Sequence, residues 1–94
     1  MAAKESVIKA LRLSPAAAEL LDSEIERHIS TACAEMIRVG VPEHAVAECG
    51  PLIESAIVIY CMAEMGDPAK YERYDAAWKF RIDNLRSTVW EEQQ

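Results

Sequence analysis

The segment from Leu52 to Met65 constrains the fold more than any other part of this sequence. Most of its residues are apolar, and on a helical wheel they occupy every sector. A helix that is apolar on all sides is normally buried on all sides. We therefore expect an all-α fold, a small four-helix domain built around this central helix. Three neighbours in so small a domain can hardly cover it, so another subunit is expected to cover part of it.

Glycine and proline residues divide the rest of the chain into segments. Gly40 and Pro42, Gly50 and Pro51, and Gly66 and Pro68 each combine a helix stop with a nearby helix start. No segment shows the alternating pattern of a strand. At 94 residues the chain has the length of one domain, residues 1–94. The predicted helices are about 4–13, 22–39, 51–65 and 68–89, followed by a tail at 90–94.

The start of the second helix is ambiguous in the sequence. Ser14-Pro15 is one start signal, and the capping-box pattern of Ser23 and Glu26 is another. We favour a start near Asp22 or Ser23. The helix then carries an apolar stripe at the helical period, which Cys33 and Ile37 widen.

The fourth helix has a narrow apolar stripe and two aromatic residues away from it. The stripe, which we expect to face the core, consists of Tyr71, Tyr74, Trp78, Ile82, Leu85 and Val89. Phe80, with its small neighbours Ala76 and Ala77, lies on the opposite side, and Trp90 is also off the stripe. Large aromatic residues that face away from a core favour a protein interface. Phe80, Ala76, Ala77 and Trp90 are therefore the predicted subunit or partner interface.

Charge and motifs argue against several other classes of protein. The net charge is −6, with five basic and eight acidic residues in each of the ranges 1–49 and 50–94, so no basic face for nucleic acid is evident. The start of the chain does not resemble a signal peptide, and the longest apolar run, Ala56–Ala63, is too short for a membrane span. We expect a cytoplasmic protein.

No chemistry-bearing motif is recognisable. Cys33, Cys49 and Cys61 have no paired spacing, and His28 and His44 do not converge with them, so we expect reduced cysteines and no metal site. Phosphate-binding loops and local catalytic signatures are lacking, which predicts no catalytic residues, no cofactor and no enzymatic activity.

Eight segments between Val7 and about Leu85 form a recognisable series. They are Val7–Leu13, Leu21–Glu26, Ala32–Met36, Gly40–Val41, Gly50–Tyr60, Met65–Asp67, Glu72–Tyr74 and Ala77–Trp78. In their order and spacing these segments resemble the phage head-to-tail connector family, whose members are also described as head-completion or DNA-packaging proteins.

The resemblance implies a structural role in the neck of a virion, with the host cytoplasm as the site of assembly. Members of this family form a ring, typically dodecameric, beneath the portal protein of the filled head. The ring provides a platform for the next head-completion or tail protein, and the genome passes through it without specific binding. An acidic channel would repel phosphate, which suits a conduit for DNA. In such a ring Phe80 would lie in the subunit contact, and Trp90 with Glu91–Gln94 would reach a partner.

A second class of function stays open from the sequence. The alternative is a small helical regulator or antitoxin-like module that sequesters a partner protein through an amphipathic groove. Stoichiometry separates the two classes, because a connector forms a closed ring and a regulator stays a monomer or dimer.

Overall fold

In the computed structural model, which describes residues 2–90, the chain forms α-helices and one short 3-10 helix, and these residues contain no strand. The all-α expectation is therefore confirmed for the described part of the chain. The elements are α1 (Ala2–Ala10), α2 (Pro15–Leu20), α3 (Asp22–Arg38), α4 (Glu43–Glu48), α5 (Pro51–Met65), η1 (Pro68–Lys70) and α6 (Tyr71–Ser87).

The central helix has the predicted bounds. Gly50 is the N-cap of α5 and Pro51 is its first residue, where the missing N–H of proline leaves no partner unsatisfied. At the other end, Gly66 follows Met65 and its N–H donates to the carbonyl of Met62 at 2.9 Å. The glycine and proline pairs are therefore reliable signals here because they act through the local backbone.

The count of four helices is wrong, because residues 2–90 contain two further short α-helices. α2 begins at Pro15, where the Ser14 hydroxyl accepts a hydrogen bond from the Ala17 N–H at 3.2 Å. A helix begins near each of the two start signals, because α2 ends at Leu20 and α3 begins at Asp22. The capping box itself does not form, because Ser23 already lies inside α3 and the N-cap makes no side-chain hydrogen bond.

α4 occupies the segment that the sequence suggests is a link. It begins after Pro42 and ends at Glu48, and the next residue, Cys49, has a left-handed backbone with φ 51°. Ala45 and Val46 are buried, so this short helix adds to the core. Six residues are too few to show a helical period, which is why the pattern does not reveal it.

Two predicted helix ends also differ. The first helix ends at Ala10 and not at residue 13, because Arg12 adopts a left-handed backbone with φ 56° and closes the end of the helix. The range 68–89 is divided into η1 and α6, with the Asp67 side chain capping η1 through the Ala69 N–H at 3.0 Å. α6 ends at Ser87, and Thr88 is extended.

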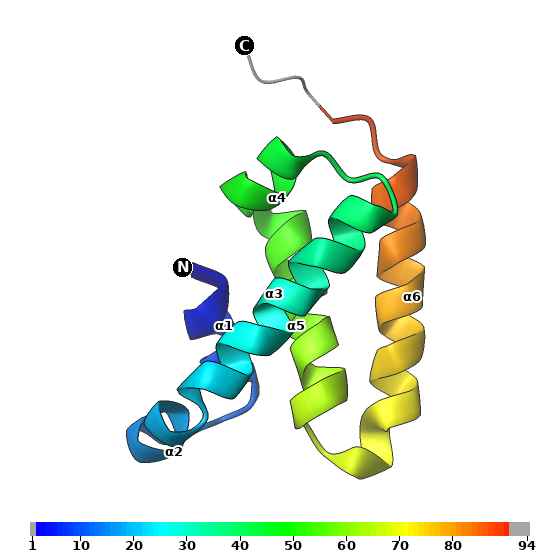
Figure 1. The fold of residues 1–94 in the computed structure, drawn as a ribbon. Coiled ribbons are helices and arrows are strands. Elements are labelled where there is room, and N and C mark those ends of the chain that lie inside the picture. Colours follow the sequence, from blue (N-terminus) through cyan, green and yellow to red (C-terminus); the bar gives the residue numbers. More distant parts are fainter. Residues whose placement is uncertain (1, 91–94) are drawn as a thin grey trace.

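Figure 1 shows α5 at the centre of the arrangement, with α6 running beside it in the opposite direction and α3 crossing in front. α5 packs against α6, α1 and α3. The molecule measures 41 × 28 × 18 Å, and its smallest dimension corresponds to two layers of helices about 8 to 10 Å apart. α5 therefore lies at the centre of the fold, as expected.

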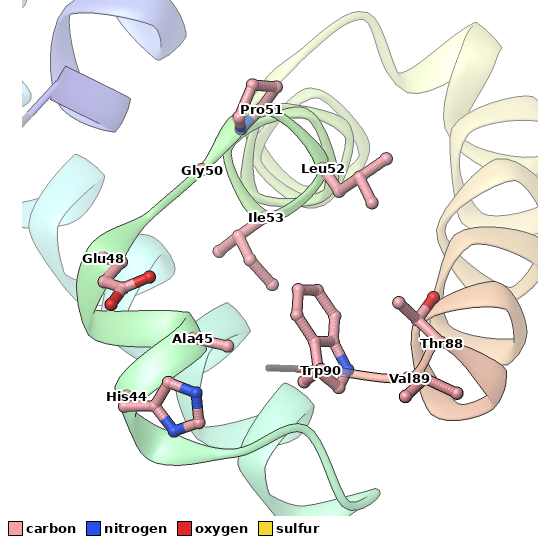
Figure 2. A pocket seen from close by; sticks show the side chains of 10 residues that line it. All are labelled: His44, Ala45, Glu48, Gly50, Pro51, Leu52, Ile53, Thr88, Val89 and Trp90. Atoms are coloured by element: carbon pink, nitrogen blue, oxygen red, sulfur yellow. The ribbon is translucent and has the colours of Figure 1, made fainter. Parts of the chain in front are cut away.

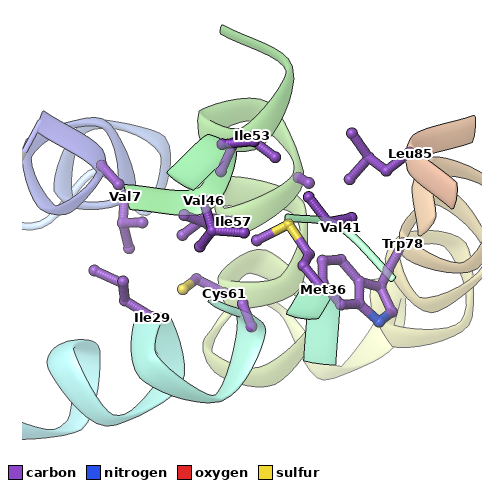
Figure 3. Packing of buried hydrophobic residues seen from close by; sticks show 14 of the residues in the cluster. Val7, Ile29, Met36, Val41, Val46, Ile53, Ile57, Cys61, Trp78 and Leu85 are labelled. Atoms are coloured by element: carbon purple, nitrogen blue, oxygen red, sulfur yellow. The ribbon is translucent and has the colours of Figure 1, made fainter. Parts of the chain in front are cut away.

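The core is apolar, and residues 2–90 contain no buried polar or charged residue. Figure 3 shows Ile53, Ile57 and Cys61 of α5 between side chains from the surrounding helices. These neighbours include Val7, Ile29, Met36, Val46, Trp78 and Leu85. The Trp78 ring meets Tyr60 edge to face, with ring centroids 5.0 Å apart.

The apolar stripe of α6 faces the core only over its middle. Trp78 and Leu85 are buried, and Tyr74 and Ile82 are half-buried. The ends differ from the prediction, since Tyr71 is exposed and Val89 is 95% exposed. Val89 lies beyond the last helical residue, so the helical period no longer decides where its side chain points.

Candidate protein-interaction surfaces

Phe80 lies where the sequence predicts, on the face of α6 turned away from α5. Its side chain is 68% exposed. Ala76 and Ala77, one turn earlier, are exposed and half-buried respectively. The small neighbours leave the aromatic ring projecting, so this face of α6 presents an isolated apolar protrusion. An interface role for these three residues stays a prediction.

Trp90 does not face away from the core, contrary to the prediction. The chain is extended after α6 and brings the indole back over the helix bundle, where it is half-buried against the core. Its Nε1–H donates to the carbonyl of Leu85 at 3.3 Å. Burial of Trp90 by its own chain argues for a structural contribution. Its role toward a partner is untested, and Glu91–Gln94 lie outside the described residues.

Trp90 also lines a hollow of about 330 Å³ beside the start of α5. Figure 2 shows the indole beneath Ile53, with Leu52 and Val89 at the rim and His44 and Glu48 on the α4 side. Leu52 is 48% exposed. The lining is mostly apolar, and its titratable side chains are His44 and Glu48, which lie one helical turn apart on α4.

One side of α5 keeps much of its apolar surface accessible. The half-buried residues Val58, Ile59 and Met62, together with exposed Leu52, lie on the arc opposite the fully buried Ile53 and Ile57. We name these four residues the open face of α5. α1, α3 and α6 cover the rest of the helix. The expected surplus of apolar surface is thus present, while its cover by another subunit is a proposal.

A second apolar surface, not anticipated from the sequence, lies between α3 and α4. It is a shallow groove of about 480 Å³. Its lining consists of Ile29, Ser30, Cys33, Ala34, Ile37, Glu43, Val46 and Ala47, and we call it the α3–α4 groove. Because α4 is short, it covers only part of the α3 flank, and Ile37 remains 39% exposed. The apolar stripe of α3, which Cys33 and Ile37 widen, is the one signal of this groove in the sequence. The sequence does not predict α4, which forms the other wall.

Charge is distributed unevenly over these surfaces, although the two halves of the sequence are balanced. Residues 70–86, which include α6, carry five basic and three acidic side chains, whereas residues 19–48 carry two basic and seven acidic ones. On α6, Lys79 pairs with Asp75 at 3.0 Å and Arg86 with Asp83 at 3.5 Å. Within residues 2–90, Arg73 makes no ion pair. α6 is therefore locally basic, and α3 with α4 is acidic.

The cysteines are free thiols in this structure. Burial raises the pKa of Cys61 to about 12, and burial also raises the pKa of Cys33 and of Cys49. Protonated thiols are weak nucleophiles and weak metal ligands. Among residues 2–90, no group of three or more histidine, cysteine or carboxylate side chains is placed to hold a metal ion. The helices of the same residues include none with the length and apolarity of a membrane span.

No protein-family model matches the sequence, and neither the search of curated proteins nor the search of solved structures gives a significant match. The resemblance to the connector family therefore rests on the residues quoted above.

Proposed function

We propose that the protein is a structural subunit of a phage head-to-tail connector, which assembles as a ring under the portal of the filled head. In this role it completes the head and provides the docking platform for the next neck or tail protein. The resemblance between Val7 and about Leu85 suggests this function, and the ring is expected to be dodecameric as in the family.

The observation that carries the proposal is apolar surface left uncovered on two separate elements. Phe80 projects from α6, and the open face of α5 remains accessible on the most apolar helix of the chain. Exposed aromatic and aliphatic side chains grouped in this way are typical of surfaces that other protein chains cover. An assembly subunit would bury such surfaces against its neighbours.

The charge supports the same role. With a net charge of −6, a ring of many copies would repel the phosphates of a DNA chain passing through it. Specific binding would need basic side chains on the inner surface. The acidic balance thus suits a conduit through which the genome slides.

The test uses the phage or prophage that encodes the chain. Removing its gene should yield DNA-filled heads that carry a portal but no tail, and adding the purified protein should place a ring on the portal vertex in electron micrographs.

Heads that acquire tails without the protein, or a vertex that stays bare after its addition, would contradict the proposal. A stable monomer or dimer that instead neutralises a toxin encoded beside it would identify the protein as a regulator.

A further inference from the structure

We propose that Phe80 of one copy inserts into the α3–α4 groove of a second copy, and that this contact joins neighbouring subunits. The inference rests on the proposed ring, and it adds the surface that receives Phe80. Both surfaces belong to the same chain, so every copy carries one protrusion and one groove.

The two surfaces match in shape and polarity. Phe80 is 68% exposed, and Ala76 and Ala77 one turn before it are small, which allows a second chain to approach this part of α6 closely. The groove is concave and apolar at its base, where Ile29 and Val46 are buried and Cys33 is half-buried. Ala34 and Ala47 at its sides are short, so they leave room for an aromatic ring. Insertion would remove apolar surface from water on both copies.

The charges around the two surfaces are complementary. Arg73 lies two helical turns before Phe80 on the same exposed side of α6, and Glu43 lies at the rim of the groove. Both side chains are exposed, and neither forms an ion pair within the described residues. The surroundings follow the same trend, since α6 is locally basic and the α3–α4 region is acidic. Opposite charges steer the second copy toward the groove and favour one orientation.

The positions of the two surfaces determine what kind of assembly they make. One flank of α3 faces α6, because Glu35, Arg38 and Val39 line a hollow together with residues of α6. The groove lies on the other flank of α3, and Phe80 lies on the side of α6 turned away from α5. The two surfaces are thus on opposite sides of the molecule. A contact between unlike surfaces leaves one of each free after every step, so it propagates beyond a dimer, and it forms a ring when the rotation between neighbouring copies closes.

Other occupants of the groove fit less well. The residues outside the described range are Met1 and the polar segment Glu91–Gln94, and the latter lacks the apolar side chains that the groove would bury. α5 carries Glu54 and Glu64 and no basic side chain, so its open face lacks the charge complementarity to Glu43 that α6 offers.

The contact can be tested by cross-linking through Cys33, which the groove already contains. An Ala76→Cys variant keeps Phe80 and places a thiol one turn away from it. With a short bis-maleimide linker, the purified protein should give a ladder of dimers, trimers and larger species, because each copy has both reactive positions. Adding Cys33→Ser to this variant should remove the species above the dimer. Arg86→Cys, whose exposed position lies about 120° around α6 from Phe80, should give no ladder.

Three results would each overturn the inference. The ladder could survive the addition of Cys33→Ser, or the Ala76→Cys variant could give dimers only, or it could give no cross-linked product at the highest soluble concentration. A charge exchange adds an independent arm: Arg73→Glu should lower the ladder yield several-fold, and adding Glu43→Arg to that chain should restore it. Folding of each variant is checked by circular dichroism, so that loss of the ladder reports the contact. If Arg73→Glu has no effect, or the exchange fails to restore the yield, the proposed pairing is wrong.

The inference and the proposed function fail in distinguishable ways. A ring on the portal vertex that forms equally well with Phe80→Asp would refute the insertion of Phe80 and leave the connector role intact. A ladder with the expected dependence on Cys33, from a protein that never binds portal-bearing heads, would support the contact and refute the connector role.

Discussion

Ile57 tests the central position of α5, because its side chain is fully buried against the other helices. Ile57→Ala removes three carbon atoms, worth about 2.4 kcal/mol at about 0.8 kcal/mol each. The cavity left behind adds about 1 kcal/mol, and the better helix propensity of alanine returns a few tenths of a kcal/mol. The expected loss is about 3 kcal/mol. For a chain of this length the whole unfolding free energy is about 5 to 14 kcal/mol.

Ile59→Ala is the matched control, since it makes the same chemical change two residues further along the same helix. Ile59 is half-buried on the open face of α5. Because Ile59 is half-buried, removing its three carbon atoms loses about half of their transfer free energy, and water fills the space they leave. The expected loss of unfolding free energy is about 1 kcal/mol or less. The losses of unfolding free energy for the two variants should therefore differ by about 2 kcal/mol in a monomer, although both replace an isoleucine of α5 by alanine.

Urea unfolding followed by circular dichroism measures both losses, at a protein concentration where sedimentation shows a monomer. In thermal unfolding, Ile57→Ala should lower the Tm by about 12 to 24 °C, from about 4 to 8 °C per kcal/mol for a domain of this size. Equal losses for the two variants, or a larger loss for Ile59→Ala, would refute the packing described for α5. If another subunit covers the open face, the loss at Ile59 should increase with protein concentration.

Three further predictions follow from local geometry. Gly66→Ala should lower stability by about 1 to 3 kcal/mol, because the added Cβ would overlap the backbone carbonyl of Met62. Gly50→Ala, whose Cβ would meet no atom, should lower it less in the same urea titration, and equal losses would contradict the clash. Cys61 should resist thiol reagents at pH 8 until the protein unfolds, because a pKa of about 12 leaves only about one thiol in ten thousand ionised. Mass spectrometry measures the labelling, and fast labelling of Cys61 in the native protein would disprove its burial. Trp90→Ala should cost about 2 kcal/mol through lost packing and one hydrogen bond, and an unchanged urea midpoint would show that the indole does not hold the chain end.

Local signals in the sequence were sufficient for the long helices. A glycine or proline acts on the backbone next to it, so α5 begins and ends where these residues predict, and α3 begins at Asp22 as expected. The apolar period placed Ile25, Ile29 and Met36 in the core, because a helix turns at a constant angle per residue. Phe80 could be recognised as exposed for the same reason.

Short helices and the chain end required the tertiary structure. α2 and α4 each have six residues, too few for a period, and α4 is buried through only Ala45 and Val46. Beyond Ser87 no helical period applies, so nothing in the sequence indicates that Trp90 turns back to the core while Val89 points into solvent. The hydrogen bond from the Trp90 indole to a backbone carbonyl of α6 exists only in the folded chain.

The candidate interface shows the same division. The sequence is enough to identify Phe80 with Ala76 and Ala77, since one helix carries all three residues. The α3–α4 groove was not accessible to the same reasoning, because it is formed by two elements whose relative position depends on how both pack on the core. Periodicity describes one helix at a time, whereas a groove depends on the surface that a neighbouring helix leaves uncovered.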